Sequence, residues 1–366
     1  MRSLLLASLA CVPLLLVAAC VGDDPSIVSA PVDAGEDRAT PTGDDSGSNL
    51  PDASGDAGGG ADQEAGPPAC SLIQVTTLTG TGAPGLTEGP GATAKFDGAE
   101  GITVGPDGTL FVADSNNKRV RKVLSDGTTS TFASGASIFS AYRLQYRSGD
   151  IYLIDRTNDA LLRITPGTPP VIGTVLQIGA LVAVGTSPGG SIYVTQTQNC
   201  YISKVNGAAS ALFSGDGAAC GFADGTAAAA RFSMSMLDIG FDGPGTMYVV
   251  DAGNFRIRKV SESDGSVTTL AGSTMGHVDG TGGAAKFEAP TGLTVDPQTH
   301  IVYVADRTTI RAITPAGVVT TLVGGAAGFD DGSGCSAKFG ELHGITYYAG
   351  SLYAVDVNRV RKVKLP

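Results

Sequence analysis

The stretch "GITVGPDGTLFVADSNNKRVRKVLSDGTTSTFASG" at residues 101–135 decides the fold of this chain. It contains four short apolar runs of alternating character, and turn signals such as Pro-Asp-Gly and Ser-Asp-Gly separate them. Alternating runs between tight turns predict four antiparallel strands joined by hairpins. Helical periodicity is absent, so the pattern favours a small sheet over a helical unit.

Copies of this stretch follow along the chain. They cover residues 141–175, 181–215, 239–272 and 292–324. A last copy at 344–366 has only three strands, and its missing fourth strand stands at the other end, where "LIQVTTLTG" at 72–80 resembles "SVTTLAG" and "VVTTLVG". We therefore predict an all-β, six-bladed β-propeller of four-stranded antiparallel blades over residues 70–366, its last blade closed by strand 72–80. Closure protects the edges of the sheets.

Each copy carries a motif at its centre, written "FVAD", then Asn and "RVRK", in residues 101–135. This motif resembles the NHL repeat, and the resemblance covers essentially all of residues 72–366. It implies a propeller but no single activity, because NHL-like propellers include extracellular sensor domains, protein- and RNA-binding modules and a lyase that amidates peptides.

The aspartate of the motif recurs in five of the six blades. Its positions are Asp114, Asp155, Asp251, Asp306 and Asp356, with Thr195 at this place in the third blade. Arg119, Arg256 and Arg359 follow near the start of the third strand. Because a reaction rarely needs five copies of one residue, we expect a structural role, with the carboxylate holding turn amides and the arginine spanning neighbouring blades.

A second repeated element lies between the blades. Its four copies are "EGPGATAKF" at 88–96, "DGTAAAARF" at 224–232, "DGTGGAAKF" at 279–287 and "DGSGCSAKF" at 331–339. We predict a structural joint in which the acid caps a turn and the phenylalanine is buried between blades. The element is missing between blades 1 and 2 and between blades 2 and 3, so that side of the ring is expected to be more open and to receive a partner.

Residues 1–20, "MRSLLLASLACVPLLLVAAC", have the composition of an export signal, and their end resembles a bacterial lipobox with Cys20 as the acylated residue. Residues 21–69 hold eleven acidic residues and one basic residue among Pro, Gly, Ser and Ala. This composition predicts a disordered acidic tether between a lipid anchor and the propeller. Residues 70–366 hold 22 basic and 24 acidic residues, which is not the basic surplus of a nucleic-acid-binding protein.

The mouth of the central channel is the place where small ligands are expected in a closed β architecture. The residues predicted just before each first strand are Glu100, Ser140, Gly179, Leu237, Thr291 and His343. Glu100 and His343 belong to adjacent blades and are a candidate pair for binding a metal or moving a proton, with Thr291 as a further candidate. His277 and His300 are expected away from this mouth, so zinc held by three histidines is not indicated.

Four cysteines remain in residues 70–366, an even number that fits an oxidising compartment. Cys200 and Cys220 are expected on the same face of the ring, which predicts a disulfide between them. Cys70 and Cys335 pair only by elimination, since strand direction places them nearer opposite faces.

We predict a monomeric lipoprotein of the bacterial cell envelope, on the outer membrane, that displays a propeller to bind a protein, peptide or glycan partner without catalysis or cofactor. The alternative is a lactonase-like or amidating-lyase-like hydrolase or lyase, with calcium or zinc at the channel mouth beside Glu100 and His343.

Overall fold

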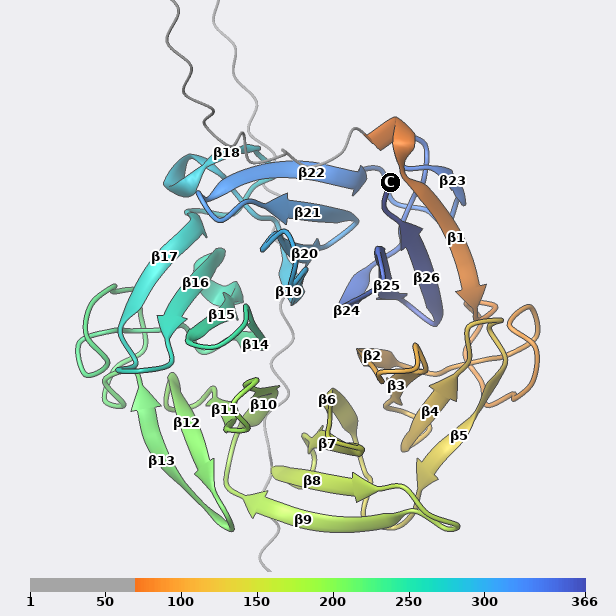
Figure 1. The fold of residues 1–366 in the computed structure, drawn as a ribbon, viewed down its shortest axis with the longest axis horizontal. Coiled ribbons are helices and arrows are strands. Elements are labelled where there is room, and N and C mark those ends of the chain that lie inside the picture. Colours follow the sequence, from red (N-terminus) through yellow and green to blue (C-terminus); the bar gives the residue numbers. More distant parts are fainter. Residues whose placement is uncertain (1–69) are drawn as a thin grey trace, which may run out of the picture. The chain divides into compact units, whose positions relative to one another are not determined.

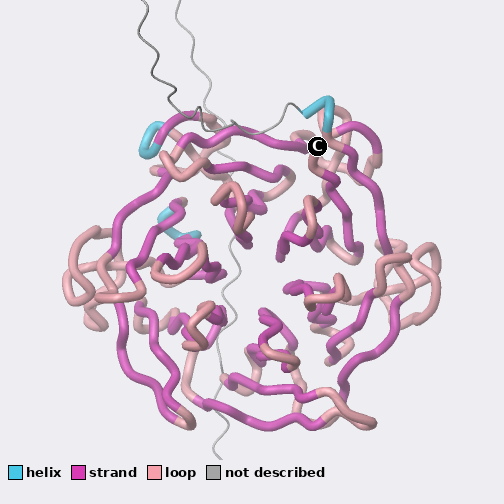
Figure 2. Tube along the Cα trace, in the orientation of Figure 1, coloured by secondary structure: helices cyan, strands magenta, loops and turns pink. Residues whose placement is uncertain are grey.

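The structure, a computed structural model, describes residues 70–366. Six antiparallel sheets stand around a central axis as the blades of a propeller (Figure 1). Strands and loops make up almost the whole ring, with three short 3-10 helices, η1 (Cys70–Leu72), η2 (Ala252–Asn254) and η3 (Gly282–Ala284) (Figure 2). The fold class predicted from the sequence is confirmed.

The strands of each blade follow one another from the channel outward. Blade 1 contains β2 (Ala99–Val104), β3 (Leu110–Asp114), β4 (Arg119–Val123) and β5 (Thr129–Ser134). Blade 2 contains β6 (Ala141–Arg147), β7 (Asp150–Asp155), β8 (Ala160–Thr165) and β9 (Val171–Gln177). Blade 3 contains β10 (Leu181–Thr186), β11 (Ile192–Gln196), β12 (Tyr201–Asn206) and β13 (Ala209–Ser214).

The second half of the ring repeats this order. Blade 4 contains β14 (Met236–Phe241), β15 (Thr246–Asp251), β16 (Arg256–Ser261) and β17 (Val267–Gly272). Blade 5 contains β19 (Pro290–Val295), β20 (Val302–Asp306), β21 (Thr309–Ile313) and β22 (Val318–Gly324), with β18 (Gly280–Thr281) added outside β22. Blade 6 contains β24 (Leu342–Tyr348), β25 (Ser351–Asp356), β26 (Arg359–Lys364) and β1 (Gln74–Thr79), with β23 (Gly332–Ser333) outside β1.

The ring closes in blade 6, where the N-terminal strand of the propeller pairs with the C-terminal one. β1 runs antiparallel to β26, with Val75 opposite Val363 (Figure 1). The closing strand therefore joins two segments at opposite ends of the domain, as the incomplete last repeat predicts.

The two faces of the ring carry different loops. The joint face, as we name it, carries the connections from each blade to the next, which are residues 80–98, 135–140, 178–180, 215–235, 273–289 and 325–341. The hairpin face carries the turns between first and second strands, which are residues 105–109, 148–149, 187–191, 242–245, 296–301 and 349–350. Each first strand runs from the joint face to the hairpin face. The short connections 135–140 and 178–180 are those predicted to lack the joint element.

The phenylalanines of the four joint elements are fully buried. Phe96, Phe232, Phe287 and Phe339 each have 0% exposure and belong to the apolar core. Burial of one such side chain contributes about 3 kcal/mol to the stability of the fold. The joints therefore extend the core between blades.

A buried ion pair accompanies each joint element. In blade 1, Asp114 accepts hydrogen bonds from the Asp97 amide and from Arg121, and Arg121 also donates to the carbonyls of Lys95 and Thr87 in the joint. The same arrangement joins Arg258 to Asp251, Arg311 to Asp306 and Arg361 to Asp356. Each arginine thus ties a blade to the connection that enters it.

The interblade arginine is therefore the second one of the Arg-x-Arg motif. The prediction that Arg119, Arg256 and Arg359 have this role is wrong for the aspartate pairing. Arg119 lies opposite Asp114 in the strand pairing but is half-buried and donates to Thr131, whereas Arg121, two positions further, is fully buried and reaches the aspartate. Arg256 and Arg359 instead cover the rings of Phe222 and Phe329.

Blades 2 and 3 differ from this pattern, because the connections that enter them carry no joint element. Leu162 and Ser203 occupy the position of the buried arginine. In blade 3 the residue at the place of the aspartate is Gln196, opposite Tyr201, and it donates to Ser203. Thr195, the residue predicted for this place, is one residue off the register of the other blades.

The acidic residue at the start of each joint bonds to the outer strand of the following blade. Asp224, Asp279 and Asp331 accept the amides of Thr269, Thr321 and Thr77, and Glu88 accepts the amide of Thr131. The sequence predicts that this acid caps a local turn, which is wrong. The carboxylate instead binds the joint element to the outer strand of the following blade.

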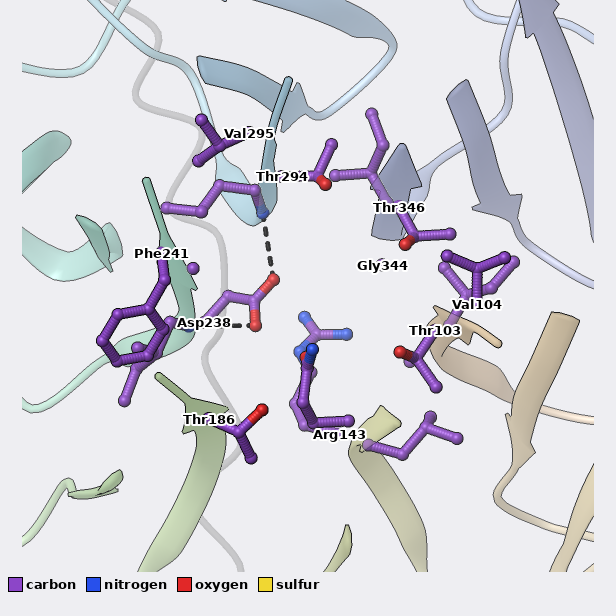
Figure 3. A pocket seen from close by; sticks show the side chains of 18 of the residues that line it. Thr103, Val104, Arg143, Thr186, Asp238, Phe241, Thr294, Val295, Gly344 and Thr346 are labelled. Carbon is purple, nitrogen blue, oxygen red and sulfur yellow. Dashed lines mark hydrogen bonds between the residues drawn. The ribbon is translucent and has the colours of Figure 1, made fainter. Parts of the chain in front are cut away.

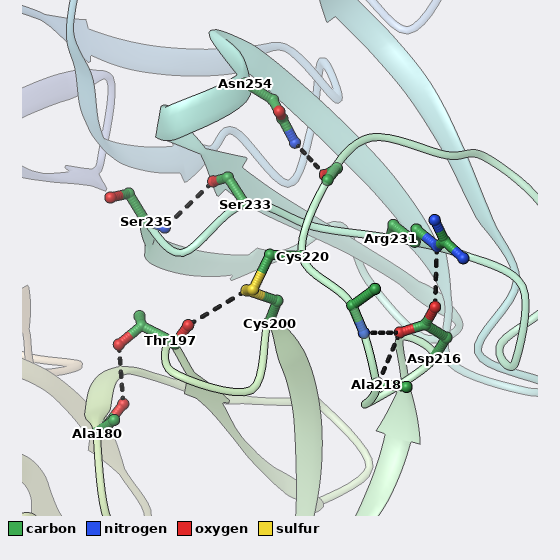
Figure 4. Close-up of a disulfide and its surroundings, with 12 residues drawn as sticks. Ala180, Thr197, Cys200, Asp216, Ala218, Cys220, Arg231, Ser233, Ser235 and Asn254 are labelled. Carbon is green, nitrogen blue, oxygen red and sulfur yellow. Dashed lines mark hydrogen bonds and ion pairs between the residues drawn. A yellow bond between two sulfur atoms is a disulfide. The ribbon is translucent and has the colours of Figure 1, made fainter.

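Within residues 70–366 two disulfides are present, and they are the pairings expected from the sequence. Cys200, in the turn between β11 and β12, bonds to Cys220 in the connection 215–235 (Figure 4). Cys335 bonds to Cys70 although the two were expected nearer opposite faces. The connection 325–341 adds β23 to the outer edge of β1, and this excursion carries Cys335 to the start of β1.

The predicted export signal, Cys20 and the acidic tether lie outside the described residues. In residues 70–366, no helix is long and apolar enough to cross a membrane.

Candidate functional site

The channel mouth on the joint face contains the Glu100 and His343 pair. Both occupy the second position of their first strands, β2 and β24. His343 Nδ1 lies 3.3 Å from Glu100 Oε2, and the two side chains are about a quarter exposed, at 24% and 25%. The structure therefore brings together the two residues that the sequence singles out.

Thr291 is the third candidate at this mouth, and its hydroxyl hydrogen-bonds to the main chain of the neighbouring blade. Its Oγ1 lies 2.9 Å from the carbonyl oxygens of both Leu342 and His343, so it ties β19 to β24. Four of the six predicted positions lie inside the first strands and not just before them; these are Glu100, Leu237, Thr291 and His343. Ser140 and Gly179 precede their strands, and the residues that align with Glu100 in blades 2 and 3 are Tyr142 and Val182.

The other histidines lie away from the mouth, as expected. His300, in a hairpin-face turn, has Nδ1 2.6 Å from Asp242 Oδ1, and the Asp242 carboxylate raises the pKa of His300. His277 lies in the connection 273–289, with Nε2 3.2 Å from the Thr321 hydroxyl. Across residues 70–366, no group of three or more His, Cys, Asp or Glu side chains is placed to hold a metal ion.

Below this mouth, Arg143 of β6 closes the channel. Its Nε donates to the carbonyl of Leu237 at 3.0 Å, Nη1 to that of Glu100 at 3.3 Å, and Nη2 to that of Thr291 at 2.8 Å. These carbonyls belong to blades 4, 1 and 5, so one side chain reaches across the axis of the ring. Arg143 is buried, with 3% exposure.

Glycines beside Arg143 let the inner strands approach closely. A Cβ at Gly101 would lie 2.5 Å from the Tyr142 carbonyl oxygen, and one at Gly344 would lie 2.8 Å from that of Glu100. Such distances are shorter than any side chain tolerates. The narrow ring at this level is what allows a single arginine to span it.

On the hairpin side of Arg143 the channel widens into a cavity of about 460 Å³ (Figure 3). First strands of all six blades line it. Its polar side chains include Thr103, Gln145, Thr186, Asp238, Thr294 and Thr346. Closed at the Arg143 end, the cavity is a cup that opens on the hairpin face.

Asp238 of β14 lies at the floor of this cup beside Arg143 (Figure 3). Its two carboxylate oxygens accept the amides of Ile239 and Leu293, each at 3.0 Å. Burial raises the pKa of Asp238 to about 6, and the positive charge of Arg143 opposes part of this shift.

Neither Arg143 nor Asp238 is a candidate from the sequence alone. A signal exists, however, once the first strands are aligned. Both residues occupy the third position, which holds Gly101, Gly292 and Gly344 in blades 1, 5 and 6 and Ala183 in blade 3. Arg143 and Asp238 are charged, whereas the other blades have glycine or alanine at this position. The contrast indicates where long side chains can extend to the axis of the propeller.

Residues 96–123, which run from the first joint phenylalanine to the end of β4, match the sequence model of the NHL repeat. The chain carries an NHL repeat. No curated protein matches the sequence.

Solved structures share the propeller fold of this chain at low identity. An auxiliary nutrient binding protein from Bacteroides thetaiotaomicron VPI-5482 superposes with a TM-score of 0.66 at 20% identity, over 80% of this chain and 76% of that one. A catalytically inactive virginiamycin B lyase from Staphylococcus aureus, with quinupristin, gives 0.52 at 14% identity, over 80% and 100%. A gluconolactonase from Xanthomonas campestris gives 0.55 at 12%, over 81% and 92%. At these identities the likeness concerns the fold alone.

Proposed function

We propose that this protein is an exported recognition module, which displays its propeller at the cell envelope and binds a protein, peptide or glycan partner without transforming it. Cys20 is the proposed lipid anchor on the outer membrane, and residues 21–69 are the proposed tether, with the propeller acting as a monomer. The two disulfides support an oxidising compartment.

The observation that carries this proposal is the closed cup in the channel. Arg143 donates hydrogen bonds to three main-chain carbonyls, so its guanidinium group stabilises the ring. The remaining cavity is concave, mostly formed by regular strands, and has a few polar groups converging on it, which are the properties of a binding site. A neighbour in fold that is named an auxiliary nutrient binding protein supports the same role.

A second candidate function is a propeller hydrolase or lyase at the opposite mouth. The contact between Glu100 and His343 favours it, because such a pair can move a proton or contribute two ligands to calcium or zinc. The fold neighbours named lyase and gluconolactonase support this candidate.

One experiment separates the two candidates. The full mature protein is incubated with glycan and peptide arrays, and every retained compound is eluted and weighed by mass spectrometry, with and without added calcium or zinc. We expect ligands to return with unchanged mass. A ligand that returns cleaved, with cleavage lost in the Glu100→Gln, His343→Gln double variant, would establish the enzyme instead, and retention of no compound would refute a recognition role for these ligand classes.

A further inference from the structure

We propose that the cavity between Arg143 and the hairpin face binds a sugar, an uncharged polyhydroxylated ring compound of one or two units. The inference rests on the proposed recognition function and names its ligand class and its site. It places the site on the opposite side of Arg143 from the Glu100 and His343 pair.

Threonine hydroxyl groups line the cavity at fixed positions. Thr103 and Thr294 accept the amides of Tyr146 and Tyr347 through their Oγ1 atoms, each at 3.1 Å. A hydroxyl that accepts an amide keeps its own hydrogen to donate. These two threonines therefore have fixed positions and a remaining donor at the wall of the cavity.

Further polar side chains line the same cavity. Thr186, Thr346 and Gln145 make no side-chain hydrogen bond to any residue within 70–366. Their donors and acceptors are therefore available to a ligand, and a polar group in a concave site gains by pairing with one. The wall thus offers neutral groups that both donate and accept.

The floor places a fixed donor beside a fixed acceptor. Arg143 has five N–H groups, of which three hydrogen-bond to carbonyls, so two remain. Asp238 accepts one amide at each oxygen and retains further lone pairs. Each hydroxyl of a neighbouring pair on a sugar ring needs both a donor and an acceptor, and this floor supplies both.

The charges of the cavity favour an uncharged ligand. Arg143 and Asp238 lie together at the floor, and Arg147 is the other charged residue of the lining. A ligand of either charge at the floor would be attracted by one of the two groups and repelled by the other. A ligand of many hydroxyls and no net charge meets neither penalty.

The size and the rim of the cavity fit the same class. About 460 Å³ falls within the range of roughly 300–1,000 Å³ that small-molecule sites occupy. Phe241 and Tyr347, two half-buried aromatic residues, are among those that line the cavity, and their rings also pack against Tyr193 and Tyr303. An aromatic ring can pack against the apolar face of a sugar while the hydroxyls point to the threonines.

The test measures calorimetric binding of D-glucose, N-acetyl-D-glucosamine and maltose to the full mature protein, with zwitterionic glycine and anionic L-glutamate as probes that carry charged groups. We expect at least one sugar to bind. Thr346→Val, which removes one hydroxyl at nearly constant volume, should weaken it about fivefold, and Asp238→Asn about tenfold or more. Thr174→Val, at an exposed threonine of β9, is the matched control and should leave affinity unchanged. Circular dichroism and thermal unfolding check that each variant folds.

Other results would overturn the inference. Sugar binding unaffected by Thr346→Val and Asp238→Asn would move the site elsewhere while leaving the recognition role intact. Binding of glycine or L-glutamate in place of sugars would replace the ligand class. Failure of all three sugars, while an array peptide or larger glycan is retained, would refute the sugar site alone. Failure of every probe in both experiments would refute the recognition function as well.

Discussion

Arg121 Nη1 lies 2.8 Å from Asp114 Oδ2 inside blade 1, and both side chains are fully buried. Burial raises the pKa of Asp114, although hydrogen bonds from the Asp97 amide, Asn117 and Arg121 oppose the shift. The pair therefore contributes little net energy as a charge interaction, but its two members depend on each other. Such pairs occur in the four blades that follow a joint element. Each pair therefore connects its blade to the preceding interblade connection.

Replacing Arg121 by methionine should destabilise the fold by about 3–5 kcal/mol, because Asp114 would remain as a buried charge without its partner. The loss should shrink in acid, where Asp114 can take up a proton. Urea unfolding at pH 7 and pH 5 measures both effects.

Arg119→Met is the matched control for Arg121→Met, two residues away on the same strand. Arg119 is half-buried and donates one hydrogen bond of 3.4 Å to the Thr131 hydroxyl, so its replacement should cost less than about 1 kcal/mol. Equal losses in the two variants would contradict the assignment of the interblade role to Arg121.

The Cys70–Cys335 disulfide should stabilise the protein more than the Cys200–Cys220 disulfide does. The first spans 265 residues of sequence and the second 20, and the longer loop removes more entropy from the unfolded chain. The chain-entropy relation gives a difference of roughly 2 kcal/mol. Denaturant unfolding of the Cys70→Ser, Cys335→Ser and Cys200→Ser, Cys220→Ser double variants compares them, and a greater loss in the second would count against this order.

Asp238 should make the protein more stable as the pH falls from 7 towards 5. Its folded pKa of about 6 lies above the ordinary value of 3.8, so the native state binds the proton more tightly than the unfolded state. The charged form is the costly one, and protonation removes that cost as the pH falls through 6. Arg143 and Arg147 are the other charged groups in the same cavity.

The comparison that isolates Asp238 is with the Asp238→Asn variant, which retains every other titrating group. Relative to this variant, the native protein should gain about 1–2 kcal/mol between pH 7.5 and pH 5. Parallel pH profiles of the two proteins would show that Asp238 titrates near its ordinary value.

Cys20 should carry the lipid that holds the protein at the envelope. Cells grown with labelled palmitate should label the native protein, whereas the Cys20→Ala variant should remain unlabelled and leave the membrane fraction. Thr174→Val, labelled in parallel, should behave as the native protein. An unlabelled native protein would remove the anchor from the proposal.

The sequence predicts part of the candidate site and misses the rest for a physical reason. Glu100 and His343 stand out because both belong to adjacent blades and carry functional side chains, and the structure brings them together. Thr291 stands out equally, but its hydroxyl bonds the neighbouring strand. Whether a polar side chain serves the fold or faces the channel depends on the carbonyls around it, which only the packed blades define.

The sequence alone determined the blades, because alternating strands and tight turns are local patterns that repeat along the chain, and the incomplete last repeat implied closure by strand 72–80. The tertiary structure decided how the centre of the ring is built. Arg143 and Asp238 come from blades 2 and 4, and each follows an ordinary strand pattern in its own segment. They meet because six first strands converge on one axis, where the small residues of the other blades leave room for two charged side chains.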